Sequence, residues 1–260
     1  MDGIAEKIAY ERRLVDAKQL RYSFNFAQHY HRWYNELLVE LLAPQRSFTI
    51  MDCGCGTGVL LPLLQQRCAR AFGLDFCLEN LLAASGAARR NTLVAADIAH
   101  LPLAPRSLDQ IVCRGVLYRL TDVSRAFEQL FTVLKDGGDL VISEPIGDSR
   151  LLQILRRSAR AAGVHPFPRG RLEHLTSRAW IAAAEGAGFR CTRWFHLGYI
   201  AFPVLGFPEA LAVMRHVPLP MAAARVLLGI DRVLARVPYL RTWSWQAMFQ
   251  FRKPRAAADR

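Results

Sequence analysis

The feature that most constrains this chain is an apolar run followed at once by a glycine-rich turn, with the sequence F-T-I-M-D-C-G-C-G-T-G over residues 48–58. The run from Phe48 to Met51 predicts a short buried strand that ends at Asp52. Glycine, which carries no Cβ atom, then occupies three alternate positions: Gly54, Gly56 and Gly58. Apolar residues from Val59 to Leu64 predict a helix. Such a strand, turn and helix present backbone N–H groups to a nucleotide-like ligand that approaches closely.

The spacing of the glycines separates two classes of ligand. A dinucleotide-binding turn follows G-x-G-x-x-G and would need glycine at position 59, where this chain has Val59. With Asp52 ahead of the turn, the stretch resembles motif I of Rossmann-like S-adenosylmethionine (SAM)-dependent methyltransferases, in which the turn lies against the amino-acid part of SAM. An ordinary strand–turn–helix is the alternative. The resemblance implies that SAM is the cofactor and that the turn binds it through Asp52, Gly54, Cys55, Gly56 and Gly58.

A second acid follows the next predicted strand. Residues 71–74 predict that strand, and Asp75 ends it about 23 residues after Asp52, near the spacing of a ribose-binding carboxylate. The resemblance implies that Asp75, with Phe76 beside it, binds the ribose of SAM. The alternative is that Asp75 only caps the following helix.

A third acid follows residues 92–96, which predict the third strand. In the resembled family the acid at this place, here Asp97, bonds the adenine amino group, and the backbone N–H of Ile98 meets the ring. An ordinary loop acid is the alternative. The segment L-P-L at 101–103, followed by L-D at 108–109, also resembles the family.

The segment after the fourth predicted strand, residues 108–113, carries the candidates nearest the chemistry. The resemblance implies that Cys113 and Arg114 contact the cofactor and that Arg114 and Tyr118 line the acceptor side. Many relatives have His or Glu at the positions of Tyr118 and Arg119, so a His-based mechanism is not carried over. The predicted helix at 122–134, the K-D-G-G turn and the predicted strand at 139–143 extend the resemblance, which covers residues 48–145 without a gap.

Alternating strands and helices predict an α/β fold with a doubly wound, mostly parallel, seven-stranded sheet. Aromatic residues in the first helices predict packing against the sheet, a cap over the ligand, or both. A helix is predicted over 150–162, a loop over 164–168 and another helix over 176–187. We expect a helical cap over 1–45, a SAM-binding core over 46–198, a lid-like insertion over 199–244, the last core strand over 245–254 and a tail over 255–260.

The insertion between the last two strands contains an amphipathic helix. Apolar side chains line one face, namely Val226, Leu227, Ile230, Val233, Leu234 and Val237, whereas Arg225, Arg232 and Arg236 lie on the other. We expect this segment to help form a lipophilic acceptor pocket and to make peripheral contact with a membrane through 222–237. Packing against the N-terminal helices alone is the alternative.

Methyl transfer from SAM requires alignment and exclusion of water, so no universal catalytic residue is expected. The candidates for catalysis are Arg114, Tyr118, His29 and Tyr30, and His31, His165 and His196 are further possible bases. No metal is expected, because Arg114 stands where catechol-type enzymes begin their set of metal-binding carboxylates. The sequence C-R-G-V at 113–116 also lacks the N/D-P-P-Y-type segment of exocyclic-amine methylases.

Charge and cysteine content bound the partners and the compartment. The formal net charge is +12 and the isoelectric point is about 10.0, which permits an anionic membrane, an acidic substrate or nucleic acid, although we do not expect nucleic acid. Six scattered cysteines and no secretory segment predict reduced thiols and a cytoplasmic protein, peripheral to the inner face of a membrane.

We therefore expect a metal-independent SAM-dependent methyltransferase that acts by direct displacement on a small, lipophilic acceptor. Two alternatives stay open: a SAM-binding protein that does not methylate or uses SAM otherwise, and an RNA or protein methyltransferase. The acceptor, its methylated atom and the oligomeric state cannot be read from the sequence.

Overall fold

The computed structural model describes residues 21–86, 92–150, 153, 154, 157, 175–206 and 219–255. The predictions made for residues 1–20, for most of 150–168, which includes His165, and for 256–260 lie outside these ranges. Within them, the predicted α/β fold is confirmed.

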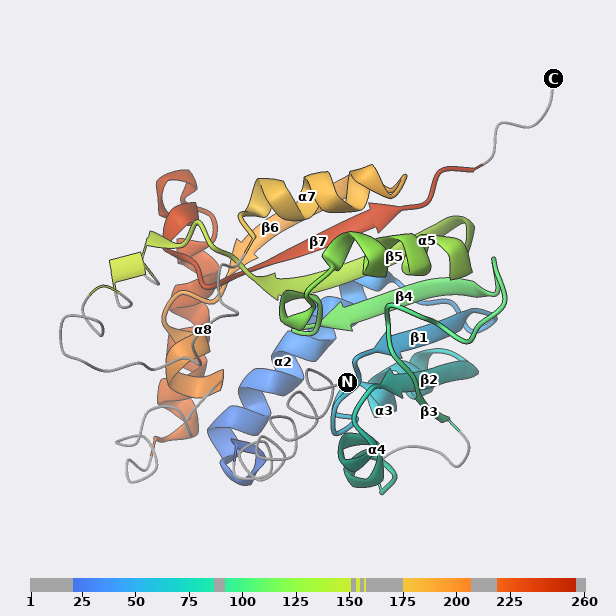
Figure 1. Cartoon of the computed structure of the whole chain (residues 1–260). Helices are drawn as coiled ribbons and strands as arrows, with labels where there is room; N and C mark the ends of the chain where they lie inside the picture. The colour runs from blue at the N-terminus through green and yellow to red at the C-terminus, as the bar shows by residue number, and fades with distance from the viewer. Residues whose placement is uncertain are drawn as a thin grey trace.

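The fold is built on one seven-stranded sheet in the order β3-β2-β1-β4-β5-β7-β6 (Figure 1). All pairs from β3 to β5 are parallel, whereas β7 runs antiparallel to both of its neighbours. The strands are β1 (Thr49–Cys53), β2 (Arg70–Asp75), β3 (Leu93–Ala95), β4 (Leu108–Arg114), β5 (Leu134–Pro145), β6 (Arg190–Leu197) and β7 (Gln246–Arg252).

Several strands begin or end one or more residues away from the predicted bounds, and two of these differences bear on the site. β1 does not end at Asp52 but continues to Cys53, because Asp52 pairs in register with Gly73 on one side and Val112 on the other. β5 begins at Leu134 and so includes the K-D-G-G stretch that was predicted as a turn. The glycines still bend it, since Gly137 has φ of +79°.

Helices cover both faces of the sheet. α2 (Asn25–Leu42) and α3 (Leu61–Arg67) pack on one face, where Ile50, Val112 and Met248 join their cluster. On the other face lie α5 (Val123–Val133), α7 (Ser177–Gly186) and the short η1 (Leu117–Arg119), and α4 (Leu78–Ala84) lies beside β2 and β3. The alternation of apolar side chains along each strand supplies both clusters.

Local chemistry explains where these helices begin. The Asp122 carboxylate accepts a hydrogen bond from the Arg125 N–H at the start of α5, and the Thr176 hydroxyl accepts one from the Ala179 N–H at the start of α7. In α3, proline lies in the first turn, where the absence of an N–H costs nothing.

The segment between β6 and β7 contains η2 (Phe202–Gly206), α8 (Met221–Leu234) and η4 (Pro238–Trp243). From the sequence we expect the sixth strand to run parallel to its neighbours. This expectation is wrong, because within the sheet β6 pairs with β7 alone and runs antiparallel to it. The carboxyl end of β6 nevertheless lies at the same edge as that of β5, since Leu197 and Pro145 both pair with Gln246.

Candidate functional site

The turn after β1 has a backbone that favours glycine at three positions. Gly54, Gly56 and Gly58 have φ values of +74°, +55° and +77°. A Cβ atom on Gly54 would lie 2.4 Å from Cγ2 of Val116, and one on Gly58 would lie 2.9 Å from the Cβ of Ala84. The turn therefore lies tightly between the segment after β4 and helix α4.

Asp75, at the end of β2, holds this turn in place. Its Oδ2 accepts a hydrogen bond from the Gly56 N–H at 2.8 Å, and its Oδ1 accepts from the Cys77 N–H at 2.9 Å and from the Asn80 amide at 3.1 Å. Each carboxylate oxygen has two lone pairs, so Oδ2 retains room for one further donor. The alternative that Asp75 caps the following helix is wrong, because the N-cap residue of α4 is Cys77 and no side chain caps that helix. The remaining capacity of Oδ2 is compatible with the predicted bond to a ribose hydroxyl.

Asp52, in β1 just before the turn, is buried with only 2% of its surface exposed. Burial raises the pKa of its carboxyl to about 7, against the lowering effect of the Arg114 charge, while Asp75 raises it further. Its Oδ2 receives no hydrogen bond from the part of the chain that the structure describes. A cationic donor on a bound ligand would satisfy this oxygen and stabilise the carboxylate.

Arg114, the last residue of β4, reaches under α2. Its guanidinium donates to Nδ1 of His31 and lies 4.8 Å from the centre of the Tyr34 ring. Because arginine can only donate, Nδ1 of His31 is the acceptor, and Nε2 carries the proton that bonds the Gly206 carbonyl at 2.9 Å. Burial, the Arg114 charge and the Arg21 charge together hold the His31 pKa well below its usual range, so His31 is neutral.

The Tyr34 side chain extends this cluster to β5 and β7. Its hydroxyl donates to Oε1 of Gln246 at 2.5 Å and is also bonded to the Ser143 hydroxyl. Burial raises the Tyr34 pKa to about 12, although the Arg114 charge lowers it. The next residue after Arg114 is Gly115, where a Cβ atom would meet only open space. Arg114 has no carboxylate within ion-pair distance among the described residues, which makes it a cation available to an anionic group.

Glu144 of β5 holds the segment that follows Arg114. The carboxylate is fully buried and accepts hydrogen bonds from the backbone N–H groups of Val116, Leu117 and Tyr118 at 3.0, 2.9 and 3.3 Å. Burial raises its pKa to about 7, while these three N–H groups lower it. Glu144 therefore fixes the path of the chain between β4 and α5.

The structure places the remaining predicted cofactor residues around the same edge. Asp97 follows β3 and turns the chain, with its Oδ1 accepting from the Ala99 N–H at 3.0 Å, and Ile98 is buried in the core. Phe76, half-buried, directly follows Asp75. The thiols of Cys55 and Cys113 are buried, and burial raises the pKa of both well above the usual value. These two residues can offer a ligand their backbone rather than a thiolate.

The four predicted catalytic residues lie on three elements: His29 and Tyr30 on α2, Arg114 at the end of β4 and Tyr118 in η1. Tyr30 is 1% exposed and packs against Phe202, and burial raises its pKa well above the usual value. Tyr118 packs on the opposite face of the sheet from α2, with its hydroxyl bonded to Arg119 at 3.0 Å. His29 is half-exposed on α2. We use the term glycine edge for the carboxyl ends of β1 and β4 together with the glycine turn at 54–58. Among these four candidates, only Arg114 lies at the glycine edge and carries a charge that can attract an anionic group of a ligand.

His165 and His196 are the two remaining histidines that the sequence offers as possible bases. His165 lies outside the described residues. His196 is buried in β6, where its Nδ1 is 2.8 Å from the Ser244 hydroxyl and burial lowers its pKa.

Sequence reasoning missed Tyr34, Glu144 and Gln246 as members of the site. Tyr34 was noted only as part of an aromatic cluster, and Gln246 lies 212 residues away from it in the chain. Glu144 had one signal, since a charged residue directly after a predicted buried strand needs partners if it is itself buried.

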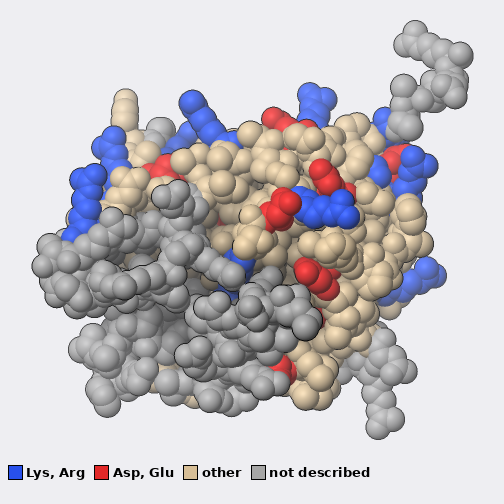
Figure 2. Space-filling view, in the orientation of Figure 1, with Lys and Arg blue, Asp and Glu red and all other residues tan. Residues whose placement is uncertain are grey.

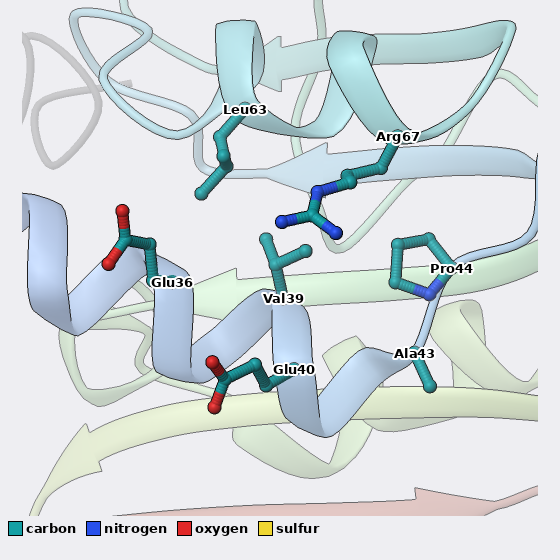
Figure 3. Close-up of a pocket in the computed structure, with 7 residues that line it drawn as sticks. All are labelled: Glu36, Val39, Glu40, Ala43, Pro44, Leu63 and Arg67. Atoms are coloured by element: carbon teal, nitrogen blue, oxygen red, sulfur yellow. The ribbon is translucent and has the colours of Figure 1, made fainter.

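A separate pocket of about 310 Å³ lies between α2 and α3 (Figure 3). Figure 3 shows Leu63 and Arg67 of α3 facing Val39 of α2, with Pro44 at its side. No residue of the glycine turn lines it. It is therefore not part of the candidate site.

Among the described residues, no group of three or more His, Cys, Asp or Glu side chains is placed to hold a metal ion.

Comparison with known proteins gives consistent results. The sequence model of the family described as "Methyltransferase domain" matches residues 51–142. A demethylmenaquinone methyltransferase of Mycolicibacterium paratuberculosis is 30% identical over 164 residues, 57% of this chain and 70% of that protein. One from Thermobifida fusca is 32% identical over 118 residues, 44% of this chain. The chain spans only half the length of this second relative.

Solved structures share the fold at low sequence identity. The [4+2]-cyclase SpnF superposes with a TM-score of 0.61 and 20% identity, covering 86% of this chain and 81% of SpnF. This likeness shows the fold alone. Together with the sequence matches, the order of the strands and the glycine edge, it leads to one conclusion: the chain belongs to the Rossmann-like, class I family of SAM-dependent methyltransferases.

Proposed function

We propose that the protein transfers the methyl group of SAM to a small, lipophilic acceptor at the carboxyl edge of β1 and β4, without a metal. The proposal rests on the buried Oδ2 of Asp52, which receives no hydrogen bond from the described residues and lies beside three glycines with positive φ. The names of the relatives support the acceptor class, because demethylmenaquinone is a lipophilic molecule.

The residues of this edge fit SAM. The carboxylate of Asp52 matches an ammonium group in charge and in its missing hydrogen bond, and the glycine turn leaves room for the amino-acid part. We assign the ribose to Asp75 and Phe76, the adenine to Asp97 and Ile98, and backbone contacts to Cys55 and Cys113. When bound, SAM would supply a methyl group on a positively charged sulfur, and this sulfur would be the leaving group when a nucleophile attacks the methyl carbon.

The contribution of the protein is then positional and electrostatic. We assign Arg114 to the acceptor side, where its charge orients and stabilises an acceptor oxygen that carries or develops negative charge. His31 and Tyr34 hold the guanidinium in place. We assign no base to Tyr30, whose hydroxyl is enclosed, and we keep His29 and Tyr118 only as residues near the acceptor.

The segment from 199 to 244 is proposed as the wall of the acceptor site. It contacts the same helix that holds Arg114, because His31 bonds the carbonyl of Gly206 and Tyr30 packs on Phe202. A wall of this kind excludes water from the displacement. No helix of the described residues is long and apolar enough to cross a membrane, and we propose peripheral association with an inner membrane face.

Calorimetry with S-adenosylhomocysteine and with NAD tests the cofactor. Gly54→Ala places a Cβ atom against Val116 at a φ of +74°, so the affinity for S-adenosylhomocysteine is expected to fall at least about tenfold. Gly86→Ala is the matched control, because its Cβ atom would meet nothing within 4 Å. Binding of NAD in place of S-adenosylhomocysteine would refute the proposal.

Methyl-labelled SAM, incubated with fractionated cell extract, tests the acceptor class. We expect the label in the lipid-soluble small-molecule fraction. Label found in RNA or protein alone would contradict a lipophilic acceptor but leave SAM binding intact.

A further inference from the structure

Helix α8 packs on the molecule through a narrow face. Ala224, Leu228 and Asp231 are its buried residues, and α2 lies between it and α3 (Figure 1). Asp231 anchors the helix, since its carboxylate accepts hydrogen bonds from the N–H groups of Tyr199 and Ile200 at 2.9 and 2.8 Å. The position of α8 is therefore specified by a buried polar contact together with the apolar packing of Ala224 and Leu228.

Another face of the helix is apolar and exposed. Val226, Ile230 and Val233 lie four and three residues apart, so they form a stripe along one side of α8. We count Val237, which follows just beyond the C-terminal end of the helix, with this stripe. Their exposed fractions are 62%, 39%, 59% and 37%. The sequence predicted these residues on one face together with Leu227 and Leu234, but the structure buries a different face. A stripe of this length is more than a water-exposed helix needs.

Basic and aromatic side chains accompany the stripe. Arg225, Arg232 and Arg236 are exposed along its edge, and the single acid in α8 and η4, Asp231, is buried. Figure 1 shows α8 at the left of the molecule, and Figure 2 shows basic side chains along the left and upper margins in the same orientation. Tyr239 in η4 is 90% exposed, and Trp243 is 37% exposed.

We propose that the stripe of Val226, Ile230, Val233 and Val237 docks onto the surface of a bilayer that contains anionic lipid. An interfacial helix places valine and isoleucine among the acyl chains while adjacent arginines meet the headgroups. Tyrosine and tryptophan favour the same boundary. The charge of the segment selects this occupant over an uncharged protein surface.

The inference deepens the proposed function and rests on it for the lipophilic acceptor. The docked helix contacts α2, which carries His31 and Tyr34 beside Arg114. Docking would therefore bring the acceptor site next to the layer in which a lipophilic acceptor dissolves.

Co-sedimentation of the full chain with vesicles tests the docking. We compare vesicles of phosphatidylcholine alone with vesicles in which about one third of the lipid is phosphatidylglycerol. We expect the protein to bind the mixed vesicles and this binding to weaken as the salt concentration is raised. Binding to vesicles of phosphatidylcholine alone is expected to be at least about tenfold weaker. Equal binding to both would overturn the choice of an anionic surface.

Substitutions locate the docking face. Val226→Ser with Val233→Ser should lower the vesicle partition coefficient at least about tenfold, since both side chains lose apolar area. Leu78→Ser with Leu82→Ser on α4 is the matched control, because these leucines are 58% and 64% exposed and should leave vesicle binding unchanged. Unchanged binding of the valine variant would overturn the proposal. A dimer in sedimentation velocity that the valine variant dissociates, without vesicle binding, would also overturn it and identify a second copy as the occupant.

Calorimetry with S-adenosylhomocysteine separates this inference from the proposed function. Wild type and the valine variant are expected to bind it equally, which shows that the variant is folded. Vesicle binding by a protein that does not bind S-adenosylhomocysteine would refute the proposed function but support the docking face. Binding of S-adenosylhomocysteine without vesicle binding would refute the docking alone.

Discussion

At the scale of a single residue, burial raises the pKa of the Asp52 carboxyl, the group that we propose binds the ammonium of the cofactor. Its pKa of about 7 lies above the usual 3.8, so between these values the folded chain holds a proton that the unfolded chain releases. The contribution of Asp52 to stability is therefore full below about pH 4 and is lost as the pH rises through about 7. A bound ammonium group would lower this pKa.

We predict that S-adenosylhomocysteine binding near pH 7 releases a proton and that affinity increases from pH 6 to pH 8. Calorimetry in buffers with different heats of ionisation measures the proton directly. Asp52→Asn should abolish the release and weaken binding by about 1.5–3 kcal/mol, the range for a hydrogen bond to a charged group. Identical heats in all buffers would show that Asp52 does not face the ligand cation.

Arg114 carries a different prediction at the same scale. Arg114→Ala should lower the turnover of the acceptor at least about a hundredfold, while the affinity for S-adenosylhomocysteine stays within about twofold, because the charge acts on the acceptor. Arg114→Lys should recover only part of the turnover, since lysine lacks the planar fork that His31 and Tyr34 hold. A parallel loss of cofactor affinity in Arg114→Ala would move Arg114 to the SAM side.

Among the elements, the segment between β4 and α5 depends on one carboxylate. Glu144→Ala would leave three backbone N–H groups without their acceptor and should lower the free energy of unfolding by about 3 kcal/mol. Glu144→Gln keeps an acceptor oxygen and should cost about 1 kcal/mol. Urea denaturation at fixed pH measures both. Equal losses in the two variants would show that packing, rather than hydrogen bonding, holds the segment.

The segment after β6 depends on Asp231 in a similar way. Asp231→Ala should increase hydrogen exchange of the N–H groups of Tyr199, Ile200 and Ala201, which all donate to its carboxylate. Exchange in the central strands should stay as in the wild type. Asp122→Ala is the control, because it removes an exposed helix cap on the opposite face. Faster exchange throughout the sheet would mean that Asp231 supports the whole fold.

Over the whole molecule, the two faces of the sheet have different tasks. The face of α5 and α7 holds Phe127, Trp180 and Phe251, all fully buried. Phe127→Ala should lower the free energy of unfolding by about 3–5 kcal/mol through the cavity it leaves, without changing the affinity for S-adenosylhomocysteine. Tyr34→Phe, on the other face, should cost about 1 kcal/mol but alter turnover. An equal change in turnover per folded protein in the two variants would contradict this division.

The sequence predicts well those features that depend on residues close together in the chain, and poorly those that depend on distant residues. The glycine turn, the acids after the strands and the order of elements depend on neighbouring residues and were predictable. The roles of Glu144 and Asp231 were not, because their partners lie 26 to 32 residues away. For α8, periodicity identified a stripe, but a buried aspartate decides which face turns inward.

The hydrogen bond from the Trp245 N–H to the Gly198 carbonyl, at 2.9 Å, joins the two ends of the segment between β6 and β7. Because β6 and β7 are antiparallel neighbours, the segment from Tyr199 to Ser244 is a single, very long hairpin connection between them. The entropy of closing such a connection grows only slowly with its length. If this segment forms the wall of the acceptor site, as we propose, replacing it with a longer or shorter one between the same two attachment points should change the acceptor and leave the fold of the glycine turn unchanged.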